Sequence, residues 1–148
     1  KQKLCENKVH FIVLKGSVIR NLYPVEDMRT SGDVDILYNE KELSIDGLEN
    51  VMMSAGFKKT KGSRTVDTFS DGNSVFEMHR QLGQDKELKY IPENLINIFD
   101  GELSATEYEM EMTHEDFYVF HIVHMARHFV AHGCGIRGLL DMYLLLQK

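Results

Sequence analysis

The sequence predicts an α/β fold, in the wider α+β sense: a small mixed sheet flanked by helices, followed by a helical C-terminal portion. Three observations lead to this prediction. Short apolar runs typical of strands alternate with helix-compatible segments in the first part of the chain. An Asp-Gly turn at residues 71 and 72 then joins two extended segments, as in a β-hairpin. The last third has the apolar periodicity of long helices.

The first half contains two predicted strands and two predicted helices. The apolar residues of 9–14 predict a buried strand, and a helix is expected at 17–22. Pro24 ends this helix, because the residue before a proline avoids the helical conformation, and a loop continues to residue 32. A strand is expected at 33–38 and a helix at 41–54, which Gly56 terminates.

The second half begins with the hairpin and then becomes helical. Its two extended segments are 64–70 and 74–81, joined by the turn at 71–73. We expect a less ordered stretch at 83–90, a short helix at 92–99, and long helices at 114–131 and 136–147.

Composition excludes several classes of protein. The 148 residues, 43% of them hydrophobic, suit one domain, or one domain and part of another. No run of about twenty apolar residues and no leader is visible, so we expect a cytoplasmic protein that does not enter a membrane. Cys5 and Cys134 are too far apart and too few for a disulfide framework or a zinc ribbon, and we interpret them as buried thiols.

The net charge of −6 provides no general attraction to a nucleic-acid backbone. A nucleic-acid acceptor would therefore need a local basic patch. The one modest cluster comprises Lys58, Lys59, Lys61 and Arg64, and we interpret it as a solvated hairpin.

Asp33 and Asp35 stand two residues apart in an apolar setting that favours a strand. Because side chains alternate along a strand, both carboxylates would point from one face, with Cα atoms about 6 to 7 Å apart. Two carboxylates that close repel each other unless a cation lies between them, and Mg²⁺ prefers oxygen ligands. The pattern predicts a divalent-metal site. The alternative is a solvent-facing turn at the start of a strand.

Gly16 and Ser17 follow the first predicted strand and open the first helix. Backbone N–H groups at a helix start lack intrahelical partners and attract phosphate. Glu77 is the predicted third carboxylate, because it lies on the extended segment 74–81. Period two places His79 on the same face, where it could contact a phosphate or the acceptor. The alternative for Glu77 is a surface charge on an edge strand.

These motifs resemble the DNA polymerase β-like nucleotidyltransferase superfamily. More narrowly, most of the chain is similar to a bacterial nucleotidyltransferase family. The resemblance rests on Leu14 to Ser17, Tyr23-Pro24, Arg29, Ser31 to Asp35, Phe76 to His79, and Gly135 to Asp141. It implies a nucleotidyltransferase-like catalytic domain over 1–90 and a helical portion over 91–148. Because the apolar periodic run 139–146 has no Gly or Pro stop signal, we expect the helical portion to be truncated at its C-terminal end.

Lys15 and Arg29 are the cationic candidates for binding the polyphosphate. Each has a structural alternative. Lys15 could be a surface residue whose stem covers apolar atoms while its ammonium stays in water. Arg29 could form a salt bridge with one of the two aspartates and orient it.

His121, His124 and His128 lie at i, i+3 and i+7, on one face of the predicted helix 114–131. Residues at i and i+7 are about 10 Å apart along the axis, so only His124 and His128 could share a zinc ion. We interpret the histidines as packing against the catalytic part. Arg137 and Asp141 are spaced i and i+4 and could pair. In the nucleotide-binding interpretation His124, Arg137 and Asp141 line the cleft instead.

The residues and the resemblance together predict a nucleotidyltransferase that uses Mg²⁺ or Mn²⁺ and a nucleoside triphosphate. Its acceptor would be an unidentified hydroxyl compound, a small molecule or protein rather than nucleic acid. The metal-binding and catalytic residues would be Asp33, Asp35 and Glu77, and the nucleotide-binding residues Lys15, Gly16, Ser17, Arg29, His79, His124, Arg137 and Asp141. One alternative is a catalytically silent nucleotide-sensing or partner-binding domain that retains the fold. Another is a zinc-stabilised helical interaction module.

Overall fold

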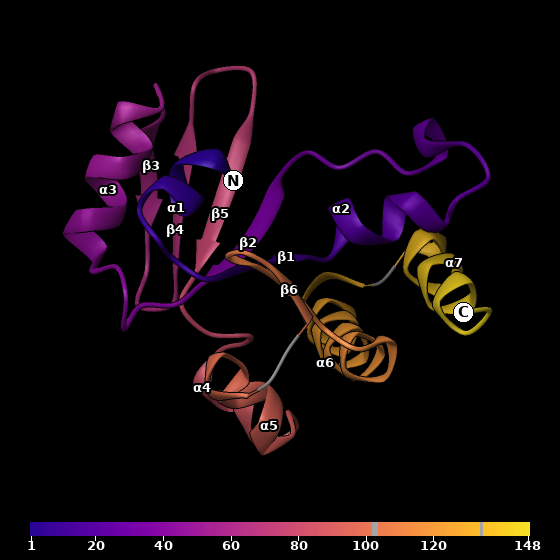
Figure 1. Cartoon of the computed structure of the whole chain (residues 1–148). Helices are drawn as coiled ribbons and strands as arrows, with labels where there is room; N and C mark the ends of the chain where they lie inside the picture. The colour runs from indigo at the N-terminus through magenta and orange to yellow at the C-terminus, as the bar shows by residue number, and fades with distance from the viewer. Residues whose placement is uncertain (102–103, 134) are drawn as a thin grey trace.

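A mixed β-sheet lies at the centre of the computed structural model, which describes residues 1–101, 104–133 and 135–148 (Figure 1). Over these residues seven strands pair in the order β3-β4-β5-β2-β1-β7-β6. The strands are β1 (Phe11–Leu14), β2 (Val34–Tyr38), β3 (Lys58–Gly62), β4 (Val66–Ser70), β5 (Val75–His79), β6 (Ser104–Thr106) and β7 (Glu109–Glu111). β2 is antiparallel to β1 and parallel to β5, so the sheet is mixed, as predicted.

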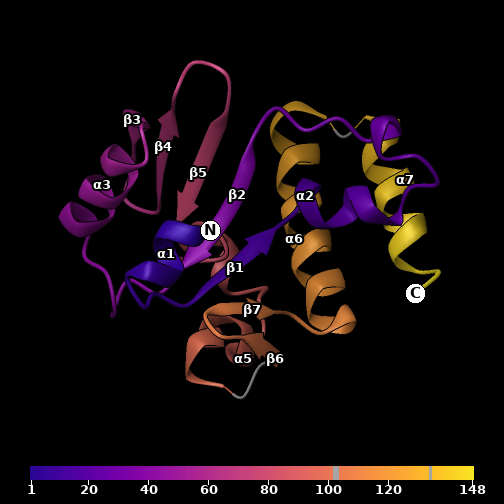
Figure 2. The ribbon, with the colours of Figure 1, turned by 45° about the horizontal axis from the view of Figure 1, so that its top comes forward.

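Helices cover both faces of this sheet. They are α1 (Gln2–Glu6), α2 (Gly16–Ile19), α3 (Ile45–Ser54), α4 (Asp85–Leu88), α5 (Glu93–Ile96), α6 (His114–His132) and α7 (Ile136–Leu145). Three short 3-10 turns, η1 (Arg20–Leu22), η2 (Glu26–Met28) and η3 (Ile98–Asp100), accompany them. Figure 2 shows α6 and α7 side by side, with α2 next to α7. The predicted fold class, including the helical C-terminal portion, is confirmed.

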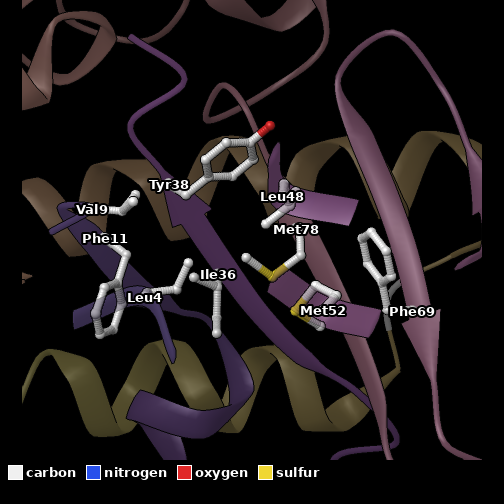
Figure 3. Close-up of a cluster of buried hydrophobic side chains, with 9 residues drawn as sticks. All are labelled: Leu4, Val9, Phe11, Ile36, Tyr38, Leu48, Met52, Phe69 and Met78. Atoms are coloured by element: carbon white, nitrogen blue, oxygen red, sulfur yellow. The ribbon is translucent and has the colours of Figure 1, made fainter. Parts of the chain in front are cut away.

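Side chains alternate between the two faces of the central strands, so the sheet has a hydrophobic core on each face. Ile36 and Tyr38 of β2 point to the face covered by α1 and α3, where Leu48 and Met52 of α3 pack (Figure 3). Leu37, between them in sequence, points to the opposite face. There the buried apolar side chains of α5 and α6 cover the sheet, among them Leu95 and Phe120. Because both faces are covered, the central strand β1 is a continuous apolar run.

Two predictions about helical segments were wrong. α3 begins at Ile45 and not at 41, because the Ser44 side chain accepts a hydrogen bond from the Gly47 N–H and caps the helix there. The stretch 83–90 is not irregular: Gln84 and Glu87 form a reciprocal capping box that starts α4.

The sequence did not predict α1, β6 or β7, and it indicated β3 only as part of a solvated hairpin. β3 has the sequence Lys-Lys-Thr-Lys-Gly, without apolar alternation, and forms because its backbone pairs with β4. The hairpin of β4 and β5 was predicted, and Phe69 lies opposite Phe76 in it. Although β6 and β7 follow residue 91, they extend the sheet beside β1. The division of the chain at residue 90 stays a prediction.

Cys5 is half-buried and free, whereas Cys134 lies outside the described residues. In the parts of the chain that the structure describes, every helix is too short or too polar to cross a membrane.

Candidate active site

Adjacent strands bring the predicted acidic residues together at one cleft. β2 and β5 are parallel neighbours, and Asp35 lies directly opposite Glu77. His79, two residues after Glu77, points from the same face. Each of Asp35, Glu77 and His79 offers a ligand atom, and these atoms lie within 4.8 Å of one another. Because β5 is an interior strand, the edge-strand alternative for Glu77 was wrong.

Asp33 lies just before β2 and lines the same cleft, half-buried. The Ser31 hydroxyl donates a hydrogen bond of 2.8 Å to its backbone carbonyl oxygen. Asp33 does not belong to the close group of Asp35, Glu77 and His79, since it precedes the regular part of the strand. Its charge nevertheless contributes to the raised pKa of Glu77, as the two carboxylates face the same space.

Asp35 is almost completely buried and accepts two strong hydrogen bonds. The ammonium of Lys15 donates one at 2.6 Å, and His79 Nε2 lies 2.8 Å from the same carboxylate oxygen. Burial alone would raise the pKa of Asp35, but the bonds and charges of His79 and Lys15 outweigh it and hold this pKa well below its usual range. Asp35 is therefore a permanent anion at neutral pH.

Glu77 differs from Asp35 in its protonation. Burial, and then the negative charge of Asp35, raise the pKa of Glu77 above its ordinary value. Its carboxylate lies 3.7 Å from His79 Nε2 and remains one-third exposed to the cleft. Of the two paired carboxylates, Glu77 is the one that accepts a proton more readily.

Lys15 occupies a strained position at the junction of β1 and α2. Its φ of 52° and ψ of −124° lie in a region that favours glycine. This conformation points the ammonium inward, and the side chain is only 14% exposed. The surface alternative for Lys15 was therefore wrong. Strain of this kind typically occurs at functional sites, where the surrounding structure maintains it.

Arg29 and Asp141 form a buried ion pair between the loop before β2 and α7. Arg29 Nε donates to Asp141 Oδ1 at 3.0 Å, and the Tyr23 hydroxyl donates to the same oxygen at 2.6 Å. Burial and the bond to Asp141 raise the pKa of Tyr23 to about 12, so this phenol remains a donor. Two expected pairings were wrong. Arg29 does not pair with Asp33 or Asp35, and Arg137 is exposed to the cleft with no ion pair among the described residues.

Because Gly16 has no side chain, Arg29 and Ser31 can lie close to the start of α2. A Cβ atom on Gly16 would lie 2.8 Å from Ser31 Oγ and 3.3 Å from both Nη atoms of Arg29. The guanidinium of Arg29 thus lies directly over the backbone where phosphate binding was predicted. Ser17, in contrast, is not among the residues that line the cleft. The phosphate-binding roles of Gly16 and Ser17 stay predictions.

The histidines of α6 form the opposite wall of the cleft. His121 is 5% exposed and stacks on Phe117, and among the described residues neither of its ring nitrogens has a hydrogen-bond partner. Burial, and then the charge of Lys15, lower the pKa of His124 to about 2, so it is neutral. Its ring contacts that of His128, with centroids 4.4 Å apart. Within the described ranges, Asp35, Glu77 and His79 are the only group of three or more possible metal ligands, and zinc binding by the pair His124 and His128 stays a hypothesis.

These walls enclose a cleft of about 950 Å³ between the sheet and the two C-terminal helices. Most of the predicted residues line it, namely Lys15, Gly16, Arg29, Asp33, Asp35, Glu77, His79, His124, Arg137 and Asp141. His121, Lys61 and Thr68 also line the cleft, although they were not assigned to the site from the sequence. Tyr23 was named only for the resemblance, and its hydrogen bond to Asp141 was not predicted. His121 was interpreted only as part of a packing face.

A mixed sheet with paired acidic strands beside a Gly-Ser helix start defines a nucleotidyltransferase-type protein. A family model described as an uncharacterised nucleotidyltransferase matches residues 1–148, so the chain belongs to that family. The resemblance stated from the sequence is therefore confirmed, and the protein is a nucleotidyltransferase by family. No curated protein matches the sequence significantly.

Solved structures with the same fold are nucleotidyltransferases as well. One is the crystal structure of ANT(2″)-Ia in complex with adenylyl-2″-tobramycin, with a TM-score of 0.66 and 11% identity over 99% of this chain and 83% of that one. Another is an antigenic nucleotidyltransferase-like protein from Paracoccidioides brasiliensis, with a TM-score of 0.60 and 11% identity over 99% of this chain and 71% of that one. At these identities the likeness concerns the fold.

Proposed function

We propose that the protein transfers a nucleotidyl group from a nucleoside triphosphate to a hydroxyl group of a small-molecule acceptor. The observation that carries this proposal is the convergence of Asp35, Glu77 and His79 within 4.8 Å at the cleft. The arrangement favours an enzyme over a silent domain, because a carboxylate oxygen of Glu77 lies within 4.8 Å of the ligand atoms of Asp35 and His79. The first structural neighbour binds an adenylylated antibiotic, which supports a small-molecule acceptor and an adenylyl donor here.

The donor set fits a divalent cation that prefers oxygen. Asp35 and Glu77 would hold Mg²⁺ or Mn²⁺, with Asp33 at the edge of the site. His79 would orient the Asp35 carboxylate through its 2.8 Å contact, as residues around metal ligands commonly do. When bound, such a cation would neutralise phosphate charge and stabilise the attacking and leaving oxygens.

The chain's own residues supply the remaining functions. Arg29 uses Nε for Asp141 and Nη1 for the Thr30 carbonyl, which holds its guanidinium rigidly against Gly16. A triphosphate at the start of α2 would meet this fixed cation and the ammonium of Lys15. Glu77, which lies beside Asp35 and is one-third exposed to the cleft, would accept the proton of the acceptor hydroxyl.

The same chemistry supports the other expectations about this protein. Neutral His124 and exposed Arg137, on the helical wall of the cleft, would contact the base or sugar of the nucleotide. We also propose a cytoplasmic location, where nucleoside triphosphates are available to the cleft.

The test is incubation with each α-labelled nucleoside triphosphate, Mg²⁺ or Mn²⁺, and a cell extract separated into small molecules, RNA and protein. We expect label in the small-molecule fraction, and none with Asp35→Asn or Glu77→Gln. Asp100→Asn is a matched control, because its carboxylate is exposed, does not line the cleft and is paired with Lys41. Transfer by Asp35→Asn at the wild-type rate would refute the proposed site.

A further inference from the structure

A β-bulge in β3 directs Lys61 into the cleft. Lys59 and Lys61 are two residues apart and would normally point to the same face of the sheet. The register shifts between them: Lys59 lies opposite Phe69, whereas Lys61 lies opposite Thr68. As a result Lys59 turns to the core side, where it contacts buried Asp67 at 3.2 Å, and Lys61 lines the cleft. Bulges commonly re-aim a side chain in this way beside active sites.

The bulge places Lys61 in one row with the proposed catalytic residues. Asp35 on β2 lies opposite Glu77 on β5, Glu77 opposite Thr68 on β4, and Thr68 opposite Lys61 on β3. Since neighbouring strands are about 4.8 Å apart, the Cα atom of Lys61 lies about 10 Å from that of Glu77. Lys61 and Thr68 both line the cleft along this interval.

Lys61 is also a cation without an anion. It is exposed and takes part in none of the ion pairs of the described residues. On β3 and β4 the carboxylate of Asp67 turns away from the cleft, to the core side, where it binds Arg80 at 2.6 Å. The carboxylates that line the cleft lie on or just before β2, on β5 and on α7, namely Asp33, Asp35, Glu77 and Asp141. Among the described residues of β3 and β4, Lys61 is therefore the charged side chain that lines the cleft.

The geometry of in-line transfer determines whether the nucleotide or the acceptor lies next to Lys61. The attacking and leaving oxygens must lie on opposite sides of the phosphorus atom. Arg29 at the start of α2 marks the side of the leaving pyrophosphate, at the β1 end of the row. The acceptor therefore approaches from the β5 side, over Glu77, and extends across Thr68 toward Lys61.

We propose that the acceptor is a small anionic molecule, with a phosphate or carboxylate that binds Lys61 about 10 Å from the hydroxyl that is modified. This inference rests on the proposed function. In the reaction the acceptor oxygen bonds to the α-phosphorus, and the bond from that phosphorus to the bridging oxygen breaks. Pyrophosphate leaves with the electron pair, and the hydroxyl proton passes to Glu77. The cleft of about 950 Å³ has the size of a small-molecule site.

The experiment uses the small-molecule extract, divided by ion exchange into anionic, neutral and cationic fractions, with labelled nucleoside triphosphate and Mg²⁺. Wild-type protein should transfer label to the anionic fraction. Lys61→Glu should lower this rate about tenfold or more by weakening acceptor binding, because it replaces a charge-assisted bond with repulsion. Lys58→Glu is the matched control, since Lys58 is exposed on the same strand but does not line the cleft, and it should act like wild type. Stabilisation by Mg²⁺-nucleotide should be the same in all three proteins.

Label only in the neutral or cationic fraction, or in RNA or protein, would overturn the inference while leaving the proposed function intact. Wild-type rates in Lys61→Glu would overturn it too, and so would loss of nucleotide stabilisation, which would place Lys61 on the nucleotide. Absence of label from every fraction would reject the proposed function, and the acceptor assignment with it. Phosphatase treatment of the anionic fraction distinguishes the two anions: acceptor activity disappears if the group is a phosphate and persists if it is a carboxylate.

Discussion

Asp141→Asn should destabilise the protein far more than removal of an equally short ion pair at the surface. Asp141 and Arg29 have side chains only 3% and 10% exposed, and they lie 3.0 Å apart. The substitution keeps the volume but leaves the Arg29 guanidinium buried without its counter-charge. Breaking a buried pair in this way costs about 3 to 5 kcal/mol. For a chain of 148 residues that corresponds to a fall in Tm of about 10 to 15 °C.

The control is Asp100→Asn, which removes the partner of Lys41. That pair is 2.8 Å long, yet its side chains are 70% and 55% exposed. Water already solvates both charges, so we expect a change in Tm of no more than about 3 °C. Tyr23→Phe should lower the Tm by an intermediate amount, because Asp141 loses the hydrogen bond from the Tyr23 hydroxyl but keeps its ion pair with Arg29.

Thermal unfolding followed by circular dichroism measures all of these variants, together with Arg137→Ala. The structure predicts that Arg137→Ala is nearly neutral, since Asp141 bonds to Arg29 and Tyr23. A loss in Arg137→Ala as large as that in Asp141→Asn would show that the helical i,i+4 pair exists after all. Equal shifts in Asp141→Asn and Asp100→Asn would refute the argument from burial.

Three further predictions concern the cleft. Asp35→Asn should abolish transfer and also lower the free energy of unfolding by about 1 to 3 kcal/mol, because two donors lose a charged acceptor; urea unfolding that matches wild type would contradict this. Gly16→Val should weaken Mg²⁺-nucleotide binding far more than Ser17→Ala, since a Cβ at Gly16 would lie 2.8 Å from Ser31 Oγ; titration calorimetry giving equal affinities would exclude the phosphate-binding turn. His124 has a pKa of about 2 in the folded protein and of 6.5 in its ordinary state. The unfolded chain therefore binds a proton at this residue below pH 6.5 and the folded protein does not, so the free energy of unfolding declines as pH falls below 6.5. Between pH 7.5 and pH 5 the loss should reach at most about 2 kcal/mol, and His124→Gln should flatten the slope of stability against pH, whereas an identical slope would show that His124 titrates normally.

Local sequence patterns were sufficient for the elements that carry the acidic residues. The two-residue period of a strand places Glu77 and His79 of β5 on one face. Their meeting with Asp35 depends in addition on the parallel pairing of β5 with β2. The Gly-Ser helix start follows in the same way from glycine and the helix-compatible residues after it. The charged segment at residues 58–62 did not indicate a strand of the sheet. β3 has no apolar period, because it is stabilised by its partner strand and not by burial of its own side chains.

The sequence by itself thus determined the family, the fold class and which residue types meet at the cleft, because these depend on local periodicity and on short motifs. Tertiary structure alone decided the partners of the charged residues. Asp141 has Arg137 one helical turn away, yet it binds Arg29, 112 residues distant along the chain. An exposed i,i+4 pair contributes only about 0.2 to 0.5 kcal/mol, whereas a buried carboxylate left without a partner costs several times as much. Tertiary structure also decided the direction of the Lys61 side chain, because it depends on a bulge that exists only once β3 has paired with β4.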